Sequence, residues 1–551
     1  MQDFKNINYE IIENLRTTDF KKRVEGIQYG TAGFRTKAED LVHVAFAMGI
    51  LSVLRSKLKK AAVGIMITAS HNPECDNGLK LVDPSGEMLE TAWEKIATDL
   101  VNADDNNFVP TLRKVIKDQG INEAAPATII LGRDTRKSSP KLAEAAIKGI
   151  DACHATLKDF GIVNTPQLHY LVVAVNTNGE YGDSSLSGYY QKLSTAFKNI
   201  RGTRINNGQY SAELQLDAAN GVGALAVKAF QEYLKGFLTV NVCNDGSGEL
   251  NYMCGADYVK IQQVPPLNVV SKPNVRCVSI DGDADRIVYF YTDENNKFHL
   301  LDGDRIATLV AEYLKGLLQE SQLSLNIGLV QTAYANGGST DYIKNNLKVP
   351  VACVSTGVKH LHHKALEFDI GIYFEANGHG TIIFKDSAMK VIRDAAKDKN
   401  TTESQRKAAA KMTDVIDVIN QTVGDALSDM LLVETILHAK GWNLSDWEES
   451  YNDLPNRQLK VKVQDRNAIE TADAERLCVK PKGLQEQIDD LVKQYSRGRS
   501  FVRPSGTEDI VRVYAECENA ADVEKLAAEV AVAVYNLANG IGPKPVVPSK
   551  M

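Results

Sequence analysis

The sequence predicts an α/β protein of several domains that ends in a small α+β domain. Three observations support this class. The chain has 551 residues, more than one hydrophobic core usually organises. Short apolar runs alternate with helical patterns along most of the chain, as in layered α/β folds with mainly parallel sheets. Beyond residue 455 apolar and polar residues alternate, which is typical of half-exposed strands.

The expected elements follow from local periodicity. Apolar runs of strand length predict strands, and longer stretches with helical periodicity predict helices. The strands are expected at residues 63–67, 79–82, 128–131, 214–216, 275–280, 326–330, 371–374, 459–463 and 510–514, and the helices at 140–150, 223–234, 304–318, 489–494 and 520–534. Polar or glycine-rich stretches at 176–187, 293–296 and 448–456 predict domain boundaries, and the charged segment 397–407 is expected to be a mobile part of the surface.

The composition is that of an ordinary globular protein, with 44% apolar and 24% charged residues. Its 63 basic and 70 acidic residues give a formal charge of −7, which argues against nucleic acid as a partner. No uninterrupted apolar stretch approaches the ~20 residues of a membrane span, and no signal peptide is expected. The eight cysteines show no paired spacing, so we expect reduced thiols in the cytosol and no zinc site.

A serine and a histidine, Ser70 and His71, follow the apolar run at 63–67. The Asn-Pro that comes next ends the strand, and a turn lets the chain return along a second strand that carries Lys80. Ser70, at an exposed strand end, and Lys80 are therefore expected to flank one loop. A turn serine that bonds its own backbone is the simpler reading of this stretch alone. The surrounding residues do not match the Gly-x-Ser-x-Gly pattern of a hydrolase.

Three aspartates, Asp281, Asp283 and Asp285, alternate directly after an apolar run. In an extended chain such side chains converge, and three carboxylates suit a hard divalent cation. Mg²⁺ is expected where a phosphate supplies a further oxygen. A calcium EF-hand is excluded, because its sixth and twelfth loop positions would be Arg286 and Thr292 instead of glycine and glutamate. An acidic turn without a cation would hold three like charges together, which is repulsive.

Two further segments offer groups that bind sugar phosphates. The segment 503–512 combines arginines, hydroxyls and a glycine, which could cradle a phosphate monoester, although Pro-Ser-Gly-Thr alone is equally an ordinary turn. Its candidate ligands are Arg503, Ser505, Gly506, Thr507 and Arg512. The segment 375–379 places Glu375, Asn377 and His379 at a strand end, where they could bind hydroxyls or an amide, or could cap a loop.

Two more segments carry arginines in turns. Gly30 and Gly33 would let Arg35 approach an anion. The segment GRDTRKSS at 132–139 is a strand-to-helix turn that fits either a phosphate site or a salt-bridged helix start.

Four motifs in this order, TASHNP, DGDADR, EANGH and RPSGT, make the chain resemble the α-D-phosphohexomutase superfamily. Within it the sequence is similar, over nearly its whole length, to the eukaryotic phosphoacetylglucosamine mutases. In most relatives a Gly-Arg-Asp motif precedes the serine loop, whereas here residues 132–134 follow Ser70, as in those mutases. Their sugar loop also resembles EANGH, where other mutases typically have Glu-x-Ser. One departure is the segment 355–359, STGVK, where some relatives have Thr-Gly-His.

The resemblance implies a fold and a set of roles. The fold would be three α/β mixed-sheet domains plus a smaller C-terminal α+β domain, arranged around a central cleft. The domains would be a phosphoserine domain at 1–178, a metal-binding domain at 179–298, a sugar-binding domain at 299–452 and a phosphate-binding domain at 453–551. The matching catalytic positions are Ser70, His71, Lys80, Arg35, Arg286 and His379, and the matching metal ligands are Ser70, Asp281, Asp283 and Asp285. Substrate would contact Thr356, Gly357, Glu375, Asn377, Gly378, Arg503, Ser505, Gly506, Thr507 and Arg512.

The function that the resemblance implies is interconversion of N-acetylglucosamine 6-phosphate and 1-phosphate in UDP-N-acetylglucosamine biosynthesis. The expected route uses a phosphoserine enzyme, Mg²⁺ and a sugar bisphosphate as intermediate and activator. Partners would be small sugar phosphates in the cytoplasm, with no nucleic acid and no membrane. The alternatives are a phosphoglucomutase or phosphomannomutase of the same superfamily, or a sugar-phosphate-binding protein without turnover.

Overall fold

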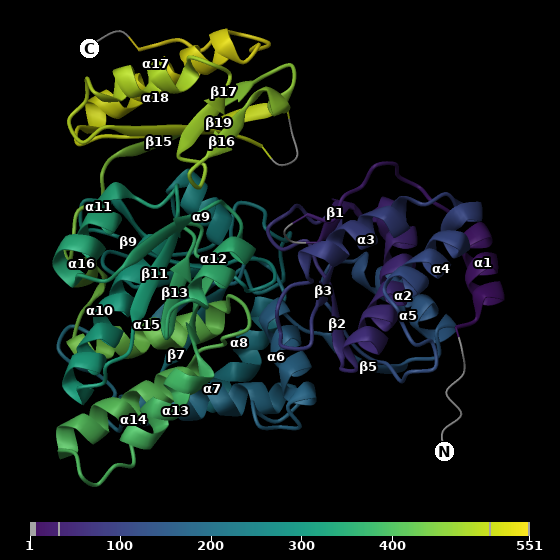
Figure 1. The fold of residues 1–551 in the computed structure, drawn as a ribbon. Helices are drawn as coiled ribbons and strands as arrows, with labels where there is room; N and C mark the ends of the chain where they lie inside the picture. Colours follow the sequence, from purple (N-terminus) through teal and green to yellow (C-terminus); the bar gives the residue numbers. More distant parts are fainter. Residues whose placement is uncertain (1–6, 31–32, 271, 506–508, 549–551) are drawn as a thin grey trace. The chain divides into compact units, whose positions relative to one another are not determined.

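The computed structural model describes residues 7–30, 33–270, 272–505 and 509–548 (Figure 1). The chain forms two compact units. Unit 1 comprises Met1–Asp302, Asn377–Thr381 and Lys411–Leu444, and unit 2 comprises Gly303–Ala376, Ile382–Ala410 and Ser445–Met551. The polypeptide therefore passes from one unit to the other several times.

The first sheet of unit 1 is built around β2 (Val63–Ile67), a fully buried strand. Val63, Ile65 and Ile67 share a core with α2 (Val42–Lys59), and the backbone of Gly64 approaches Val172 of α6 (Thr165–Asn176), so helices cover both faces. The strand order is β1 (Phe34–Lys37), β3 (Asp76–Val82), β2, β4 (Thr128–Arg133) and β5 (Thr156–Ile162), antiparallel from β1 to β2 and parallel from β2 to β5. The other helices are α1 (Tyr9–Thr18), α3 (Thr91–Asn102), α4 (Phe108–Asp118) and α5 (Ser139–Ala152).

The second sheet of unit 1 contains the strand that directly precedes the three aspartates. Its order is β10 (Phe298–Leu301), β9 (Ile287–Thr292), β8 (Cys277–Ile280), β6 (Glu213–Asp217) and β7 (Thr239–Cys243), with antiparallel pairing from β10 to β8 and parallel pairing from β8 to β7. The helices of this part are α7 (Leu186–Arg201), α8 (Gly223–Leu234), α9 (Ala256–Gln262) and α15 (Ala426–Lys440). Asp281 directly follows β8, a buried strand, so the fold holds the start of the acidic loop rigidly.

The larger sheet of unit 2 has the order β12 (Val351–Val354), β11 (Ile327–Thr332), β13 (Ile370–Phe374) and β14 (Gly380–Phe384). β11 pairs in parallel with β12 and with β13. Its helices are α10 (Gly303–Ser321), α11 (Gly337–Asp341), α12 (Val358–Ala365) and α13 (Asp386–Ala395), with a π-helical turn at Tyr342–Leu347; α14 (Glu403–Val418) and α16 (Leu444–Glu448) span the chain divisions.

The C-terminal part of unit 2 is a three-stranded antiparallel sheet with the order β15 (Asn456–Lys462), β19 (Ile510–Glu516) and β18 (Arg499–Pro504). Alternate residues such as Val461, Val511 and Val513 are buried in a core with α18 (Ala520–Leu537), and Leu484 and Ile488 of α17 (Leu484–Val492) join them. A separate hairpin is formed by β16 (Glu470–Ala472) and β17 (Leu477–Lys480). The predicted class, α/β sheets followed by an α+β part, is confirmed.

Several local expectations were wrong. The first two sheets are mixed, as the resemblance implied, whereas the alternation of strands and helices alone predicted mainly parallel sheets. The polar stretch 293–296, expected at a domain boundary, is the turn between β9 and β10, because β10 pairs with β9 and stays in the second sheet. Residues 299–302 therefore belong with unit 1, as do 377–381 and 411–444 of the expected sugar-binding domain. The helix expected at 489–494 begins at Leu484, and the segment 397–407 includes the start of α14.

Among the described residues, one helical stretch, Ala38–Lys59, meets the length and composition criteria for a membrane span. In the fold 94% of its apolar window is buried inside the protein, as expected for the core helix of a layered domain.

α2 and α5 approach one another through small residues. A Cβ atom added to Gly49 of α2 would lie 2.1 Å from the carbonyl oxygen of Ala146, and one added to Gly149 of α5 would lie 2.3 Å from that of Phe46. The two backbones therefore touch where neither helix has a side chain.

We expect Gly49→Ala to lower the free energy of unfolding by ~1–3 kcal/mol, because the added methyl group overlaps backbone that cannot move aside. Gly316→Ala is the matched control, since Gly316 is an exposed position of α10 with nothing within 4 Å of its added Cβ. This control should stabilise by ~0.5–1 kcal/mol through helix propensity. Urea unfolding followed by circular dichroism would reveal the opposite signs, and shifts of the same sign would contradict the close packing.

Candidate active site

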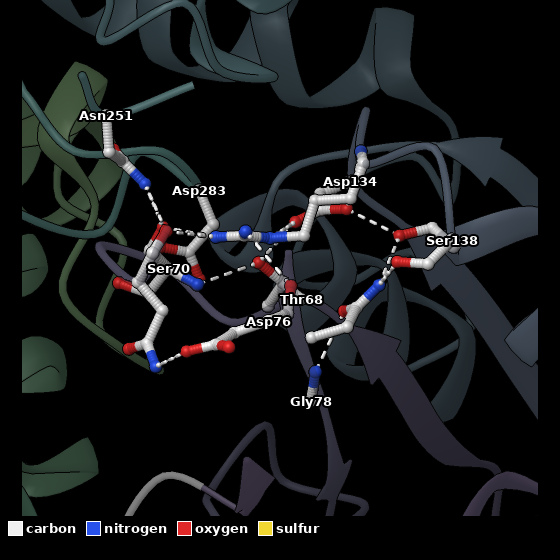
Figure 2. A network of polar contacts seen from close by, with 12 residues as sticks. Thr68, Ser70, Asp76, Gly78, Asp134, Ser138, Asn251 and Asp283 are labelled. Carbon is white, nitrogen blue, oxygen red and sulfur yellow. Dashed lines mark hydrogen bonds and ion pairs between the residues drawn. The ribbon is translucent and has the colours of Figure 1, made fainter. Parts of the chain in front are cut away.

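Ser70 lies in the loop after β2, within a network of polar contacts that includes Thr68, Asp134 and Asn251 (Figure 2). Its Oγ donates a hydrogen bond to Asp281 Oδ2 at 2.5 Å, and its backbone N–H donates to Thr68 Oγ1 at 3.1 Å. Ser70 is 1% exposed, so the expectation of an exposed serine was wrong. The loop is covered because the acidic loop of the second sheet closes over it.

Two donors, the buried Arg136 and the half-buried Asn251, hold the backbone of this loop. Arg136 donates from Nη2 to the carbonyl oxygens of Ser70 and Asn72, both at 2.9 Å, and from Nη1 to those of Pro73 and Asp76. Asn251 Nδ2 donates to the same two carbonyls of Ser70 and Asn72 at 2.8 and 2.9 Å. Ser70 has a φ of 50°, a left-handed conformation that non-glycine residues rarely adopt. The contacts of Arg136 and Asn251 stabilise that conformation.

Arg136 thereby decides between the two readings of the segment 132–139. Its Nε donates to Asp134 Oδ2 at 3.0 Å, and Asp134 also accepts hydrogen bonds from Thr68 and Ser139. The segment is a salt-bridged helix start that positions the serine loop. The Nε, Nη1 and Nη2 groups of this arginine all donate to protein oxygens.

The three aspartates converge as expected. Oxygen atoms of Asp281, Asp283 and Asp285 lie within 4.8 Å of one another, and all three side chains are buried. Ala284 between them has a φ of 58°, and Asp281 Oδ1 accepts the backbone N–H groups of Asp285 and Arg286 at 3.0 and 3.1 Å. The loop therefore folds back on its first carboxylate, which gathers the three side chains.

Basic side chains lie next to this cluster. Lys80 Nζ lies 3.3 Å from Asp283 Oδ2 and 3.7 Å from Asp285 Oδ2, and His379 Nδ1 lies 3.4 Å from Asp285 Oδ1. Burial and the neighbouring carboxylates raise the pKa of Asp281 well above its usual range. Burial also acts to raise the pKa of Asp285, but His379, Lys80 and Arg286 outweigh it and hold that pKa well below its usual range. The charges in this cluster are strongly coupled.

The donor set fits a divalent cation. Asp283 Oδ2 is engaged by Thr165 Oγ1 at 2.7 Å and by Lys80, whereas Asp283 Oδ1 is buried and has no hydrogen-bond partner among the described residues. A buried carboxylate oxygen without a donor is costly unless a ligand reaches it. Three carboxylates and the Ser70 oxygen supply only oxygen ligands, as hard cations prefer.

Two more of the predicted catalytic residues lie near the cluster. Arg35 follows Gly33, whose φ of 87° and close approach to the Leu79 carbonyl leave no room for a side chain. Burial lowers the pKa of the Arg35 guanidinium, which the charges of Asp283, Asp285 and Asp281 oppose. Burial, followed by the charge of Arg286, lowers the pKa of His71 to about 4, so its imidazole is neutral at neutral pH.

The segment 377–379 joins the acidic loop in unit 1. Gly378 accepts the backbone N–H of Ile287 at 3.1 Å, and a Cβ at Gly378 would lie 1.9 Å from the Ile287 carbonyl oxygen. Asn377 Oδ1 accepts the backbone N–H of His379 at 3.0 Å, which leaves its Nδ2 as a donor for other groups. Arg286, which pairs with His379 through a β-bridge, donates from Nη1 to Asp257 Oδ1 at 2.7 Å.

In unit 2, three cations occupy one row of the C-terminal sheet. Arg503 on β18 is the cross-strand partner of Arg512 on β19, and Arg512 is in turn the partner of Lys460 on β15. Directly opposed residues share one face of an antiparallel sheet, and like charges in that position repel. Ser505 follows β18 and its N–H donates to the Ile510 carbonyl at 2.9 Å. Gly506 and Thr507 lie outside the described residues.

Two residues that contact Arg503, Glu475 and Tyr334, were not predicted from the sequence. Glu475 Oε1 lies 3.7 Å from Arg503 Nε, and Glu475 Oε2 accepts the backbone N–H of Thr356 at 3.0 Å and also its hydroxyl. The Arg503 guanidinium lies 5.9 Å from the ring centroid of Tyr334. Only Thr356 and Arg503 were predicted. Glu475 and Tyr334 sit in segments without a recognisable motif, and only the alternation of the strands could have indicated Lys460.

Glu375 and Gly357 are the remaining predicted substrate contacts. Glu375 directly follows β13 in unit 2 and is half-buried. Gly357, with a φ of 128°, precedes α12 and thus begins the helix beside Thr356.

Family models match four consecutive parts of the chain. The phosphoglucomutase/phosphomannomutase alpha/beta/alpha domain I matches residues 42–108 and 101–180, and the C-terminal domain of that family matches residues 459–533. Between them, domains II and III of phosphoacetylglucosamine mutase AMG1 match residues 183–288 and 302–442.

The chain is 53% identical over 520 residues to the phosphoacetylglucosamine mutase of Sus scrofa, which covers 94% of this chain and 96% of that protein. A solved N-acetylglucosamine-phosphate mutase, a member of the alpha-D-phosphohexomutase superfamily in its substrate complex, matches with a TM-score of 0.91 at 46% identity, over 95% of this chain and 98% of that one. Aspergillus fumigatus N-acetylphosphoglucosamine mutase in complex with GlcNAc-6P and magnesium matches with a TM-score of 0.91 at 44% identity, over 97% and 100% of the chains. A variant of that enzyme has been solved with glucose 1,6-bisphosphate.

The fold and the buried serine beside an acidic cluster define an α-D-phosphohexomutase. Within that superfamily the chain belongs to the phosphoacetylglucosamine mutase family.

We expect Asp283→Asn to weaken binding of a divalent cation at least about tenfold, because it removes one of three anionic ligands. Asp245→Asn, an exposed aspartate in a turn of the same unit, is the control and should leave binding unchanged. Calorimetric titration of both full-length variants with Mg²⁺ measures the effect. Equal affinities for the two variants would remove Asp283 from the cation site.

Proposed function

We propose that this enzyme interconverts N-acetylglucosamine 6-phosphate and N-acetylglucosamine 1-phosphate, with Ser70 as the residue that carries the transferred phosphoryl group. The observation that carries the proposal is the buried Ser70 hydroxyl, 2.5 Å from Asp281 in a cluster of three carboxylates. The substrate that the matched A. fumigatus structure names supports the choice of sugar.

The reaction would proceed in two transfers. In the first, the bond between the phosphorus and Ser70 Oγ breaks while a bond from the phosphorus to a sugar hydroxyl oxygen forms; the hydroxyl loses its proton and Ser70 regains one. The product of this step is a sugar bisphosphate. In the second, the other phosphoryl group returns to Ser70 Oγ by the reverse exchange, which leaves the isomeric monophosphate. The glucose 1,6-bisphosphate in a related structure supports such an intermediate.

The residues of unit 1 would prepare Ser70 for this exchange. Arg136 and Asn251 hold the loop backbone, so the hydroxyl keeps one orientation, which favours reaction by positioning. Arg35, Arg286 and Lys80 would stabilise the negative charge of the transferred group. His71, neutral at neutral pH, could hold the phosphoserine by hydrogen bonding. His379 would orient Asp285.

Asp281, Asp283, Asp285 and an oxygen on Ser70 would hold Mg²⁺, and the buried Asp283 oxygen without a donor supports this assignment. When bound, Mg²⁺ supplies positive charge that offsets the charge of the phosphoryl oxygens.

The residues of unit 2 would recognise the phosphate that does not react. Arg503 and Arg512, opposed across two strands, provide a bidentate and charge-assisted site for a phosphate monoester, and Ser505, Gly506 and Thr507 would complete it. Thr356, Gly357 and Glu375 would contact the sugar hydroxyls, and Asn377 and Gly378 would contact the acetamido group.

The four domains expected from the sequence remain our proposal, with the third beginning after Asp302 instead of at residue 299. The consecutive family-model matches support this division. We also propose that the enzyme acts in the cytoplasm on small sugar phosphates for UDP-N-acetylglucosamine synthesis, without nucleic acid or membrane partners.

Ser70→Ala should lower turnover of N-acetylglucosamine 6-phosphate at least ~1,000-fold, because the oxygen that carries the phosphoryl group is lost. Ser247→Ala, at an exposed loop serine of the same unit, should retain activity. A coupled assay for the 1-phosphate, with circular dichroism to verify folding, tests both. Full activity of the folded Ser70 variant would refute the mechanism.

Asn377→Ser should reduce the preference for N-acetylglucosamine phosphate over glucose phosphate by roughly tenfold to a hundredfold in kcat/KM. The Asn377 Nδ2 group can donate to the acetamido carbonyl while Oδ1 stays bonded to His379, and a serine hydroxyl would have to serve both contacts. Glu375→Gln is the comparison, since its contacts are to hydroxyls present in both sugars. If Asn377→Ser lowers both rates equally, the residue only shapes the loop.

A further inference from the structure

Glu475 stands at the tip of the β16–β17 hairpin in an unusual backbone conformation. Asp473, Ala474 and Glu475 have φ values of 51°, 55° and 67°, three successive non-glycine residues in the left-handed region. Such residues are rare singly and persist only where surrounding contacts hold them. Arg476 closes the turn, because its backbone N–H and its Nε donate to the Asp473 carbonyl and its Nη2 donates to Asp473 Oδ1 at 2.6 Å. These hydrogen bonds hold the turn that carries the Glu475 side chain.

The Glu475 carboxylate uses both of its oxygens. Oε2 accepts the N–H and the hydroxyl of Thr356, and Oε1 lies 3.7 Å from Arg503 Nε. Thr356 and Arg503 lie 147 residues apart in the sequence, and each was assigned to substrate from its own motif. The carboxylate thus lies between Thr356 and Arg503, whose donor groups an anionic ligand would also use.

The contact with Arg503 is incomplete. Arg503 Nε is buried and makes no hydrogen bond within the geometric limits to a described residue. The Arg503, Arg512 and Lys460 row also places like charges opposite one another, which calls for an anion on this face. One carboxylate at 3.7 Å partly offsets this repulsion, whereas a phosphate with three oxygens could satisfy several donors at once.

We propose that Glu475 is an internal competitor of the substrate phosphate: its carboxylate pairs with Arg503 in the ligand-free enzyme and gives up that arginine when the phosphate binds. Glu475 keeps Thr356 in place through Oε2 in the ligand-free state. The exchange lowers the affinity for the phosphate and makes its release easier. Release matters in a mutase, because the bisphosphate has to let go of this site before its second phosphate can reach Ser70. This inference rests on the proposed role of Arg503.

The expected size follows from competition. If Glu475 occupies Arg503 about 90% of the time in the ligand-free chain, the apparent affinity for the phosphate is reduced about tenfold. Removing the negative charge, while an oxygen stays available for Thr356, should restore that affinity. Glu475→Gln makes this change without altering the size of the side chain.

The test is calorimetric titration of the full-length protein with N-acetylglucosamine 6-phosphate in buffer without divalent cations. Glu475→Gln should bind about tenfold more tightly than the unmodified enzyme, and inorganic phosphate should show the same direction. In turnover assays the same variant should have a lower KM and a kcat that is equal or lower. Unchanged or weaker binding by the folded variant would overturn the proposal. Unchanged binding would mean that Glu475 does not compete for Arg503, and weaker binding would mean that Glu475 itself contacts the substrate.

Three further variants make the result specific. Glu470→Gln, on β16 of the same hairpin, loses an exposed ion pair with Lys480 and should bind as the unmodified enzyme does. In an Arg503→Ala background Glu475→Gln should bring no gain, because the competition is for that arginine. If the glutamine variant does not fold, Glu475→Asp replaces it. This variant keeps the negative charge on a shorter side chain, so it should bind the phosphate more tightly than the unmodified enzyme, but by less than tenfold. Unchanged affinity would count against the proposal.

Failure of the inference can be told from failure of the proposed function. If the unmodified enzyme does not convert N-acetylglucosamine 6-phosphate but Glu475→Gln still binds phosphate more tightly, the function is wrong and the competition stands. If conversion is efficient and binding is equal in both proteins, Glu475 does not compete.

Discussion

The mutual repulsion of three buried carboxylates is the constraint on which the rest of unit 1 depends. Asp281, Asp283 and Asp285 converge within 4.8 Å away from solvent, and such an arrangement is unfavourable unless positive charge is supplied. Lys80 from β3 supplies part of it, and His379 from the distant segment 377–381 lies 3.4 Å from Asp285 Oδ1. The loop of the first sheet, the acidic loop of the second and a segment from the third quarter of the chain are thereby joined at one point. Removal of one partner of such a buried pair typically costs ~3–5 kcal/mol.

The serine loop shows a second kind of positioning. A left-handed Ser70 would not persist by local preference, and the hydrogen bonds from Arg136 and Asn251 to its carbonyl compensate for this conformation. Arg136 lies in the loop after β4 of the first sheet, and Asn251 lies in the loop after β7 of the second. The orientation of the reactive hydroxyl therefore depends on both sheets, which explains why an α/β scaffold carries the residue on a loop at a strand end. In unit 2 the charges are reversed. Arg503, Arg512 and Lys460 lie opposite one another on neighbouring strands, and a bound anion would offset their repulsion.

Much of the fold was predictable, because strand and helix periodicity is a local property. The strand at 63–67 and the helix at 223–234 match β2 and α8, and the alternation after residue 455 marked the α+β part. The edge strand β10 was not predicted and a domain boundary was expected just before it, because a polar turn inside a hairpin resembles a polar linker in sequence. In the candidate site, motif residues such as Ser70 and Asp283 were recognisable. Asn251, Thr165 and Glu475 were not, because single polar residues in loops carry no pattern.

The sequence alone determined the family and the chemistry on offer, since the order of four motifs and the types of their side chains do not depend on coordinates. It also determined that Asp281, Asp283 and Asp285 alternate, which is sufficient to predict that they could share a cation. Only the tertiary structure decided that Ser70 is buried, that Arg136 binds the backbone carbonyls of the serine loop, and that Glu475 faces Arg503. The physical reason is that hydrogen bonds and ion pairs depend on distances of a few ångströms between groups far apart in the chain, and only packing of the sheets and helices sets those distances.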